Sequence, residues 1–233
     1  MYKRQLQHRG QEAWGIATPT MNPFKQNGLV TDNLDQSAQV LQQMKTNIAI
    51  GHVRYSTAGG TSLSNAQPFS INKKFCIAHN GTVCDLNSVN TKITGQKPRR
   101  INDTSIVGKR LLSILKVNKS DWFKSIELLC EELVGAYCFV ILTPNNEIYA
   151  FRDTRGFRPL CIGWHKKSKT YLVSSESCAF SMIGAELKRD IKPGEIVKIS
   201  NKGVESYSFS RGERTAHCSF EYIYFAHPSS CLL

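Results

Sequence analysis

The chain has 233 residues, of which 41% are hydrophobic, and its excess of Lys and Arg gives a formal net charge of +12. This length and composition suffice for a domain with a full core, and they exclude a largely disordered chain. No apolar run is long enough to cross a bilayer and residues 1–7 contain no apolar signal segment, so we expect a cytoplasmic protein without a membrane span.

The positive charge makes a polyanionic partner, such as nucleic acid or a phosphorylated substrate, one hypothesis. Lys and Arg are scattered, however, and their runs are no longer than pairs such as those at residues 73–74, 99–100 and 166–167. Aromatic residues do not interleave with them as they do in single-strand binders. This distribution therefore disfavours nucleic acid as a partner.

The first predicted elements are short strands. The stretch "LQHRGQEAWGIATPT", from Leu6, has the pattern of a polar turn that leads into a buried strand. The segments "TPNNE" and "SNKGV" are typical of hairpin turns, which predicts antiparallel sheet. Further strands are predicted at residues 48–53, 75–78, 137–142, 148–151, 160–163, 171–174 and 196–199.

Two helices are predicted in the middle of the chain. The first covers residues 102–117, with capping candidates Asn102 and Asp103 and with apolar residues at helical spacing (Val107, Leu111, Ile114 and Leu115). The second begins at Ser120 and stops at Gly135. No linker or repeat divides the sequence, so we expect one α+β domain over residues 1–233, with sheets inside and helices outside.

Eight cysteines are spread along the chain without a close CxxC pair, and several lie in apolar runs such as "GAYCFVIL". This distribution predicts reduced, buried thiols rather than a disulfide framework or a zinc site. We therefore expect no metal site.

Three short segments contain residues suited to ligand binding or catalysis. In "GHVRYSTAGG", Arg54 ends a strand and the hydroxyls of Ser56 and Thr57 follow. An arginine in this position can bind a carboxylate through two hydrogen bonds, and the hydroxyls can add to them. The alternative is a structural ion pair.

The other two segments are "IAHNGT" and "NDTS". The side-chain amide of Asn80 and the backbone N–H of Gly81 could form an oxyanion hole, although an ordinary Asn-Gly turn is the alternative. Asp103 heads a helix, where it either caps the backbone or holds a ligand's ammonium group. Together the three segments could hold a free α-amino acid and polarise its side-chain carbonyl, but they include no nucleophile.

The order of nine motifs resembles the amidophosphoribosyltransferase family among the class II glutamine amidotransferases. Tyr55 and the last aromatic segment favour this family over glucosamine-phosphate synthase and asparagine synthetase. The motifs are "LQHRGQE", "GHVRYSTAGG", "NAQPF", "IAHNG", "NDTS", "RDTRGFRPLCIG", "SSES", "IKPGEIVKIS" and "FEYIYFAHPSS".

The resemblance implies an N-terminal-nucleophile hydrolase-like fold, a four-layer αββα sandwich of two antiparallel sheets. It implies that Arg54 and Thr57 bind the glutamine carboxylate and that Asp103 binds the amine. The implied oxyanion hole is Asn80 with Gly81. By the same resemblance, Arg9 and Gly10 form the turn that lines the nucleophile.

The chain departs from the family's pattern at several positions. In the family, a strand that begins with an N-terminal cysteine nucleophile precedes "LQHRGQE", whereas this sequence starts with Met1 and Tyr2. We therefore expect the chain as written to be inactive. Trp14 and Ser105 also replace the residues usual in the family, and Trp14 could crowd the pocket.

The resemblance also implies parts beyond this sequence. A phosphoribosyltransferase domain would follow Leu233, and full-length relatives use Mg and in some cases an iron–sulfur cluster. Cys218 is a weak candidate for one cluster ligand, but a cluster needs about four thiolates. We expect no cofactor within this chain.

Two functional hypotheses follow, and enzymatic activity stays open between them. The first is a truncated glutaminase domain, whose family supplies ammonia to make 5-phosphoribosylamine from phosphoribosyl pyrophosphate in the first step of de novo purine biosynthesis. The second is a catalytically dead glutamine-binding or interaction module. The expected partners are glutamine and either a second copy of the chain or a full-length relative.

Overall fold

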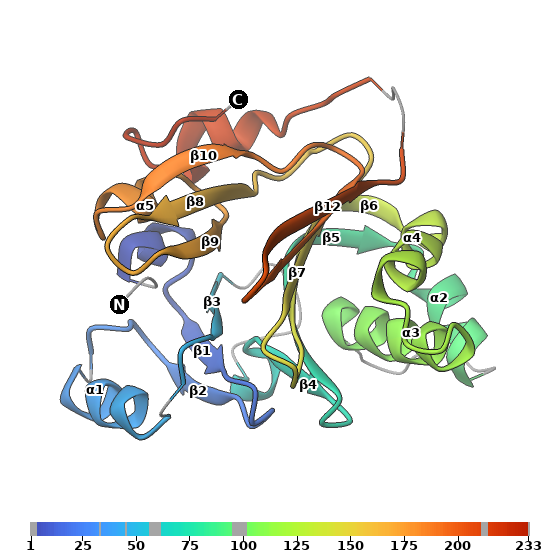
Figure 1. Ribbon diagram of the computed structural model, residues 1–233, viewed down its shortest axis with the longest axis horizontal. Helices are drawn as coiled ribbons and strands as arrows, with labels where there is room; N and C mark the ends of the chain where they lie inside the picture. Colours follow the sequence, from blue (N-terminus) through green and yellow to red (C-terminus); the bar gives the residue numbers. More distant parts are fainter. Residues whose placement is uncertain are drawn as a thin grey trace.

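A six-stranded antiparallel sheet forms the centre of the molecule, in the strand order β12-β11-β7-β6-β5-β4 (Figure 1). The computed structural model describes residues 4–32, 34–44, 46–55, 62–94, 102–210 and 214–232. The strands of this sheet are β4 (Phe69–Ile71), β5 (Phe75–Cys84), β6 (Val134–Leu142), β7 (Ile148–Arg152), β11 (Glu195–Ser200) and β12 (Gly203–Ser208).

Both predicted hairpins are present in this sheet. Between β6 and β7 the backbone N–H of Thr143 donates to the carbonyl of Glu147 at 3.0 Å, and Asn146 takes a left-handed conformation with φ 58°. Strands β11 and β12 pair up to Ser200 opposite Gly203. The turn residues noted in the sequence therefore fix the register of both strand pairs.

Two three-stranded antiparallel sheets form a second layer, with the orders β2-β1-β3 and β10-β8-β9. The resemblance predicted a single sheet in this layer, whereas the structure has two separate sheets. Among the described strands, none pairs with the outer edge of β3 or of β9. The strands are β1 (Ala13–Ala17), β2 (Phe24–Asn27), β3 (Ile50–Arg54), β8 (Cys161–His165), β9 (Thr170–Ser174) and β10 (Glu186–Asp190).

Successive side chains of β6 point to opposite faces of the large sheet. Phe139 and Ile141 pack in one cluster with residues of the helices α2 (Leu86–Thr94), α3 (Asp103–Val117) and α4 (Trp122–Glu132). Cys138 and Leu142 point the other way and pack against the two small sheets. The helix α5 (Cys178–Ser181) covers the far side of β8 through Phe180. The structure is thus a mixed α/β fold with antiparallel sheets, in which three helices cover one face of the large sheet and the small sheets cover the other.

The two predicted helices are confirmed, with one change at each end of the second. Asn102 caps α3, and its side chain accepts from the N–H of Thr104 at 3.0 Å. Helix α4 is capped by Asp121 instead of Ser120, because the Asp121 carboxylate accepts from the N–H of Lys124 at 3.1 Å. Gly135 does not end this helix; it lies in β6.

The remaining elements are short, so they contain too few turns for sequence periodicity to reveal them. They are α1 (Leu34–Gln43) and three short helical segments, η1 (Arg4–Arg9), η2 (Leu63–Asn65) and η3 (Glu221–Phe225). Within the ranges described above, the structure has no helix with the length and apolarity that a membrane span requires.

Candidate functional site

The open edge of β5 is the centre of the candidate site. Strand β4 pairs with β5 only as far as Phe69 opposite Ile77, whereas β6 pairs with β5 along the whole strand. Asn80 and Gly81 lie inside β5, opposite Cys138 and Tyr137, so the alternative of an ordinary Asn-Gly turn is wrong. From His79 onward the other edge of β5 has no strand partner among the described residues.

Two side chains form hydrogen bonds with the backbone of His79 at this edge. The N–H of His79 donates to Oε1 of Gln67 at 2.7 Å, and Nε2 of His52 donates to the carbonyl of His79 at 3.1 Å. The backbone groups of His79 therefore point away from β6. Gln67 and His52 are site residues that the sequence reasoning missed, although Gln67 belongs to the noted "NAQPF" motif.

The same alternation directs the N–H of Gly81 to the open edge, because every second residue of an antiparallel strand faces the same neighbour. Tyr137, which lies opposite Gly81, uses its own N–H and carbonyl on Asp153 of the next strand connection. The pair Gly81–Tyr137 is thus a non-hydrogen-bonded pair. A backbone donor is left facing outward, as an oxyanion hole requires.

Asn80 supplies a second donor beside Gly81. Its Nδ2 is buried and has no hydrogen-bond partner among the described residues. Gly81 has φ 133°, and a Cβ on it would overlap the carbonyl oxygen of Ala136, so only glycine fits. Two N–H donors and a fixed backbone are what a developing negative charge on an amide oxygen would need.

Asp103 lies at the start of α3, on the helix side of β5. Its Oδ1 accepts from the N–H of Thr104 at 2.7 Å, and its Oδ2 lies 3.4 Å from Nδ1 of His79. Burial would raise the pKa of Asp103, but hydrogen bonds from His79 and Thr104 outweigh it and hold this pKa below its ordinary value. The side chain is 24% exposed, so an ionised carboxylate faces solvent. Since Asn102 is the cap, Asp103 remains able to bind a ligand's ammonium group.

Arg54 is the last residue of β3 and is buried. Its Nη1 contacts the carbonyl of Ser62 at 3.4 Å. Strand β3 lies beside the open edge of β5, since His52 of the same strand reaches His79 there. The predicted partner Thr57 and its neighbour Ser56 lie outside the described residues.

The Arg9–Gly10 turn packs on the end of β3. A Cβ on Gly10 would overlap the backbone of Arg54, and the N–H of Glu12 donates to the Arg54 carbonyl at 3.1 Å. The Arg9 side chain points elsewhere: Nη1 donates to Glu176 at 2.6 Å and Nη2 to Glu221 at 2.8 Å. Its guanidinium is occupied by two carboxylates, so the structure leaves only the backbone of this turn for contact with a ligand.

Burial opposes the charge of Arg9, but these two carboxylates raise the pKa of the guanidinium above its ordinary value. The arginine is therefore part of a buried ion-pair network. Arg158 joins the network, because its Nη1 donates to Glu221 at 2.9 Å.

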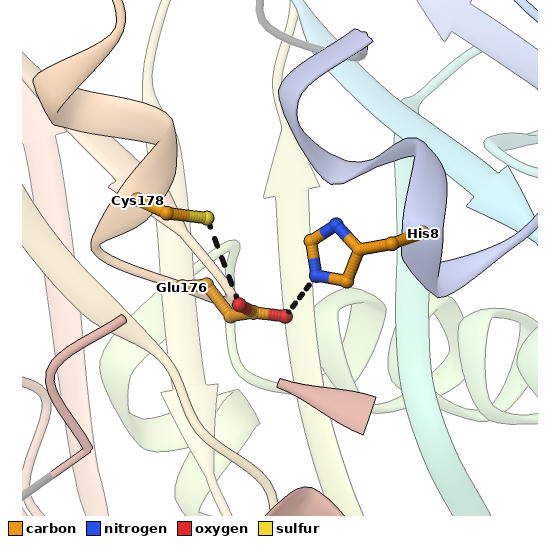
Figure 2. A group of neighbouring side chains, drawn as sticks. All are labelled: His8, Glu176 and Cys178. Carbon is orange, nitrogen blue, oxygen red and sulfur yellow. Dashed lines mark hydrogen bonds and ion pairs between the residues drawn. The ribbon is translucent and has the colours of Figure 1, made fainter. Parts of the chain in front are cut away.

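One group of described residues has the composition of a metal site, His8 with Glu176 and Cys178 (Figure 2). Nε2 of His8 lies 2.8 Å from one Glu176 oxygen, and the Cys178 thiol lies 3.6 Å from the other. Glu176 also accepts hydrogen bonds from the Arg9 guanidinium at 2.6 Å, from the N–H of His227 at 2.8 Å and from the hydroxyl of Ser230 at 2.6 Å. A cation would have to displace these donors and would lie beside a guanidinium, so this group does not fit a metal.

Cys218 does not belong to any group of three possible ligands in the part of the chain that the structure describes. The cluster role suggested by the resemblance stays a prediction, as does the use of Mg by full-length relatives. No disulfide joins the eight cysteines, and five of them are buried, as predicted; Cys84, Cys218 and Cys231 are not.

Two buried thiols near Asn80, those of Cys76 and Cys138, are poor nucleophiles. Cys138 lies opposite Asn80, but burial raises the pKa of its thiol to about 12 and its sulfur donates to the carbonyl of Arg158 at 3.1 Å. Burial also raises the pKa of Cys76 to about 11. Because the thiolate is the attacking species, neither cysteine is suited to attack an amide.

Trp14, which the sequence reasoning placed near the pocket, is buried in β1. Its ring packs against Phe24 with a centroid distance of 5.5 Å. Ser105 lies in the first turn of α3 and donates its N–H to the Asn102 carbonyl at 3.1 Å. Whether Trp14 narrows the pocket stays a prediction.

Comparisons with known proteins identify the family of the chain. Residues 52–182 match a family model described as "Glutamine amidotransferase domain". The amidophosphoribosyltransferases of Archaeoglobus fulgidus and Methanothermobacter thermautotrophicus are 37% and 39% identical to the chain over 97% of its length. The matched region is 50% and 48% of those relatives, so the chain spans about half their length.

Solved structures of glutamine amidotransferase proteins also match the fold of this chain. The glutamine phosphoribosylpyrophosphate amidotransferase from B. subtilis, complexed with ADP and GMP, superposes with a TM-score of 0.84 at 34% identity. That match covers 99% of this chain and 50% of the other. A class II glutamine aminotransferase domain protein from Silicibacter pomeroyi, at 12% identity and a TM-score of 0.56, shares the fold alone.

Proposed function

The chain belongs to the glutamine amidotransferase domain family, and on this premise we propose that the open edge of β5 binds L-glutamine. Asp103 holds the α-ammonium group of the ligand, and Arg54 holds its α-carboxylate. Asn80 and the N–H of Gly81 receive the oxygen of the side-chain amide. The unpartnered, buried Nδ2 of Asn80 is the observation that best supports this assignment, since it is a donor without an acceptor.

The amide bond of glutamine breaks when a nucleophile attacks its carbonyl carbon and the nitrogen leaves as ammonia. The oxyanion-hole donors stabilise the negative charge that develops on the oxygen. A thiolate close to this edge would complete the reaction, and the raised pKa values of Cys76 and Cys138 argue against these two thiols. We propose that the residues described here bind and polarise glutamine and that the attacking group comes from elsewhere.

The relatives that match over 97% of this chain are amidophosphoribosyltransferases. We extend the proposal to their overall activity: ammonia released from glutamine would replace the pyrophosphate of phosphoribosyl pyrophosphate and give 5-phosphoribosylamine. The second candidate is a glutamine-binding module without catalysis. The unsuitable thiols of Cys76 and Cys138 favour this candidate for the 233 residues taken alone.

Calorimetric titration of the purified chain with L-glutamine tests the binding site. We expect saturable binding, and we expect Asp103→Asn to weaken it at least about 10-fold, because a neutral amide does not pair with an ammonium ion. Asp121→Asn is the matched control, since Asp121 also begins a helix and asparagine caps as well as aspartate. A chain that binds no glutamine at millimolar concentration, or an Asp103→Asn variant that binds normally, would contradict the proposal.

Glutamate release separates the two candidate functions. We expect no release above background from the chain as printed. A form that carries an added N-terminal strand beginning with cysteine should release glutamate if the pocket is competent, and should only bind glutamine if it is not.

A further inference from the structure

His79 is the buried polar residue that connects Asp103 to β5, and the site described above gives it no contact with a ligand. Its side chain is 4% exposed, and its ring stacks on Phe139 with a centroid distance of 4.4 Å and an interplanar angle of 12°. Nδ1 lies 3.4 Å from Oδ2 of Asp103 and 3.4 Å from the hydroxyl of Thr104. Nε2 is buried and has no partner among the described residues.

These contacts determine which ring nitrogen carries the proton. The pKa of Asp103 lies below its ordinary value because the hydrogen bonds of His79 and Thr104 outweigh burial, so the group is a carboxylate at neutral pH. A carboxylate accepts hydrogen bonds and cannot donate one, so the ring nitrogen that faces it, Nδ1, carries a proton. Nε2 is left in the interior without a hydrogen-bond partner among the described residues, which disfavours the imidazole relative to an apolar ring.

A phenyl ring would stack on Phe139 equally well without that cost. What the imidazole adds is therefore the Nδ1–H donor. The two oxygens of Asp103 are held by different partners: Oδ1 by Thr104, whose N–H lies 2.7 Å away, and Oδ2 by His79. The N–H and the hydroxyl of Thr104 both contact Oδ1, so the contact of His79 with Oδ2 restricts rotation of the carboxylate in a way that Thr104 does not.

We propose that His79 is a positioning residue for the ammonium group of the ligand, acting through its Nδ1–H on Oδ2 of Asp103. This inference rests on the proposed glutamine site. Because the Asp103 side chain is 24% exposed, its carboxylate, which has more lone pairs than these contacts use, remains accessible to the ligand. His79 itself does not touch the ligand.

Two substitutions separate the donor from the ring. His79→Phe keeps the stacking on Phe139 but removes the donor. His79→Asn loses the ring but places an amide N–H close to the position of Nδ1. Each variant of the 233-residue chain is titrated with L-glutamine and with 4-carbamoylbutanoate, which is glutamine without its amine, and its melting temperature is measured.

We expect His79→Phe to fold and to bind glutamine about 5- to 20-fold more weakly, less than the full effect of a hydrogen bond to a charged group, because His79 acts on the ligand only through Asp103. Its affinity for 4-carbamoylbutanoate should stay within about 2-fold, because that ligand has no ammonium group to place. His79→Asn should melt at a lower temperature and yet bind glutamine more tightly than His79→Phe. A purely structural role would produce the reverse order, with the greater loss of binding in His79→Asn and for both ligands.

Two results would overturn the role of His79 while leaving the glutamine site intact. The first is a His79→Phe variant that binds glutamine with normal affinity. The second is a His79→Phe variant that loses affinity for glutamine and for 4-carbamoylbutanoate by the same factor. If the unchanged chain fails to bind glutamine, the proposed function fails first, and the role of His79 fails with it.

Discussion

Gly81 is the residue whose backbone the candidate oxyanion hole depends on most directly. Its φ of 133° is a conformation that other residues rarely adopt, and a Cβ would overlap the Ala136 carbonyl oxygen on β6. The overlapping atom belongs to a paired strand, so it cannot move aside as a flexible side chain would. Asn80 and Gly81 can act as donors only while this part of β5 keeps its register.

We expect Gly81→Ala to lower the free energy of unfolding by about 2–4 kcal/mol, from backbone strain and steric overlap together. For a chain of this size that corresponds to a fall in melting temperature of roughly 5–15 °C. Gly184→Ala is the matched control, because Gly184 also has a positive φ, 72°, but its added Cβ would meet nothing within 4 Å. Equal losses in the two variants, measured by thermal unfolding, would show that the contact with Ala136 is unimportant.

At the scale of elements, Glu176 joins three segments that are far apart in the sequence. It accepts hydrogen bonds from His8 and Arg9 of η1 and from His227 and Ser230 near the end of the described chain, and it precedes α5. Its side chain is fully buried. Burial alone would raise the pKa of Glu176, but its hydrogen bonds with His8, Ser230 and Arg9 hold this pKa well below the ordinary value of 4.5.

We expect Glu176→Gln to destabilise the fold at pH 7 by about 3 kcal/mol, because it leaves Arg9 with one carboxylate instead of two. A depressed carboxyl pKa stabilises the folded state above the unfolded pKa, and this stabilisation declines as the pH falls below about 4.5. The difference between the wild type and Glu176→Gln should therefore shrink between pH 5 and pH 3, as measured by urea unfolding. Glu186→Gln, which removes only exposed pairs with Lys166 and Lys188, should have little effect at either pH.

At the scale of the whole molecule, the described surface has two features that favour association. The helix η3 and the residue before it expose large apolar side chains, namely Phe220, Tyr222, Ile223 and Tyr224. The outer edges of β3 and β9 have no strand partner among the described residues. Exposed apolar side chains and open strand edges are common routes to contact with another chain.

We therefore expect the isolated chain to associate at micromolar concentration, although its charge of +12 opposes this. Replacing Ile223, which is 71% exposed, with lysine should reduce association with little effect on the melting temperature. Val117→Lys, at an exposed apolar residue that is 81% accessible at the end of α3, is the control and should leave association unchanged. Light scattering that shows a monomer for the unchanged chain would contradict this expectation.

The sequence by itself determined the local features and the family. The cap at Asn102, the apolar spacing of α3 and the two hairpin turns depend on residues a few positions apart, and the structure confirms them. The order of the motifs also predicted the glutamine amidotransferase relationship that the family model and the superposition bear out.

Only the tertiary structure decided how the site is put together. The strand that contains Asn80 continues to Cys84 because β6 pairs along it, and its other edge is open because β4 pairs with it only as far as Ile77. Arg9 binds Glu176 and Glu221, which follow it by 167 and 212 residues. Local periodicity carries no information on such distant partners, since which edge of a strand is open, and which carboxylate meets an arginine, depends on how the layers pack.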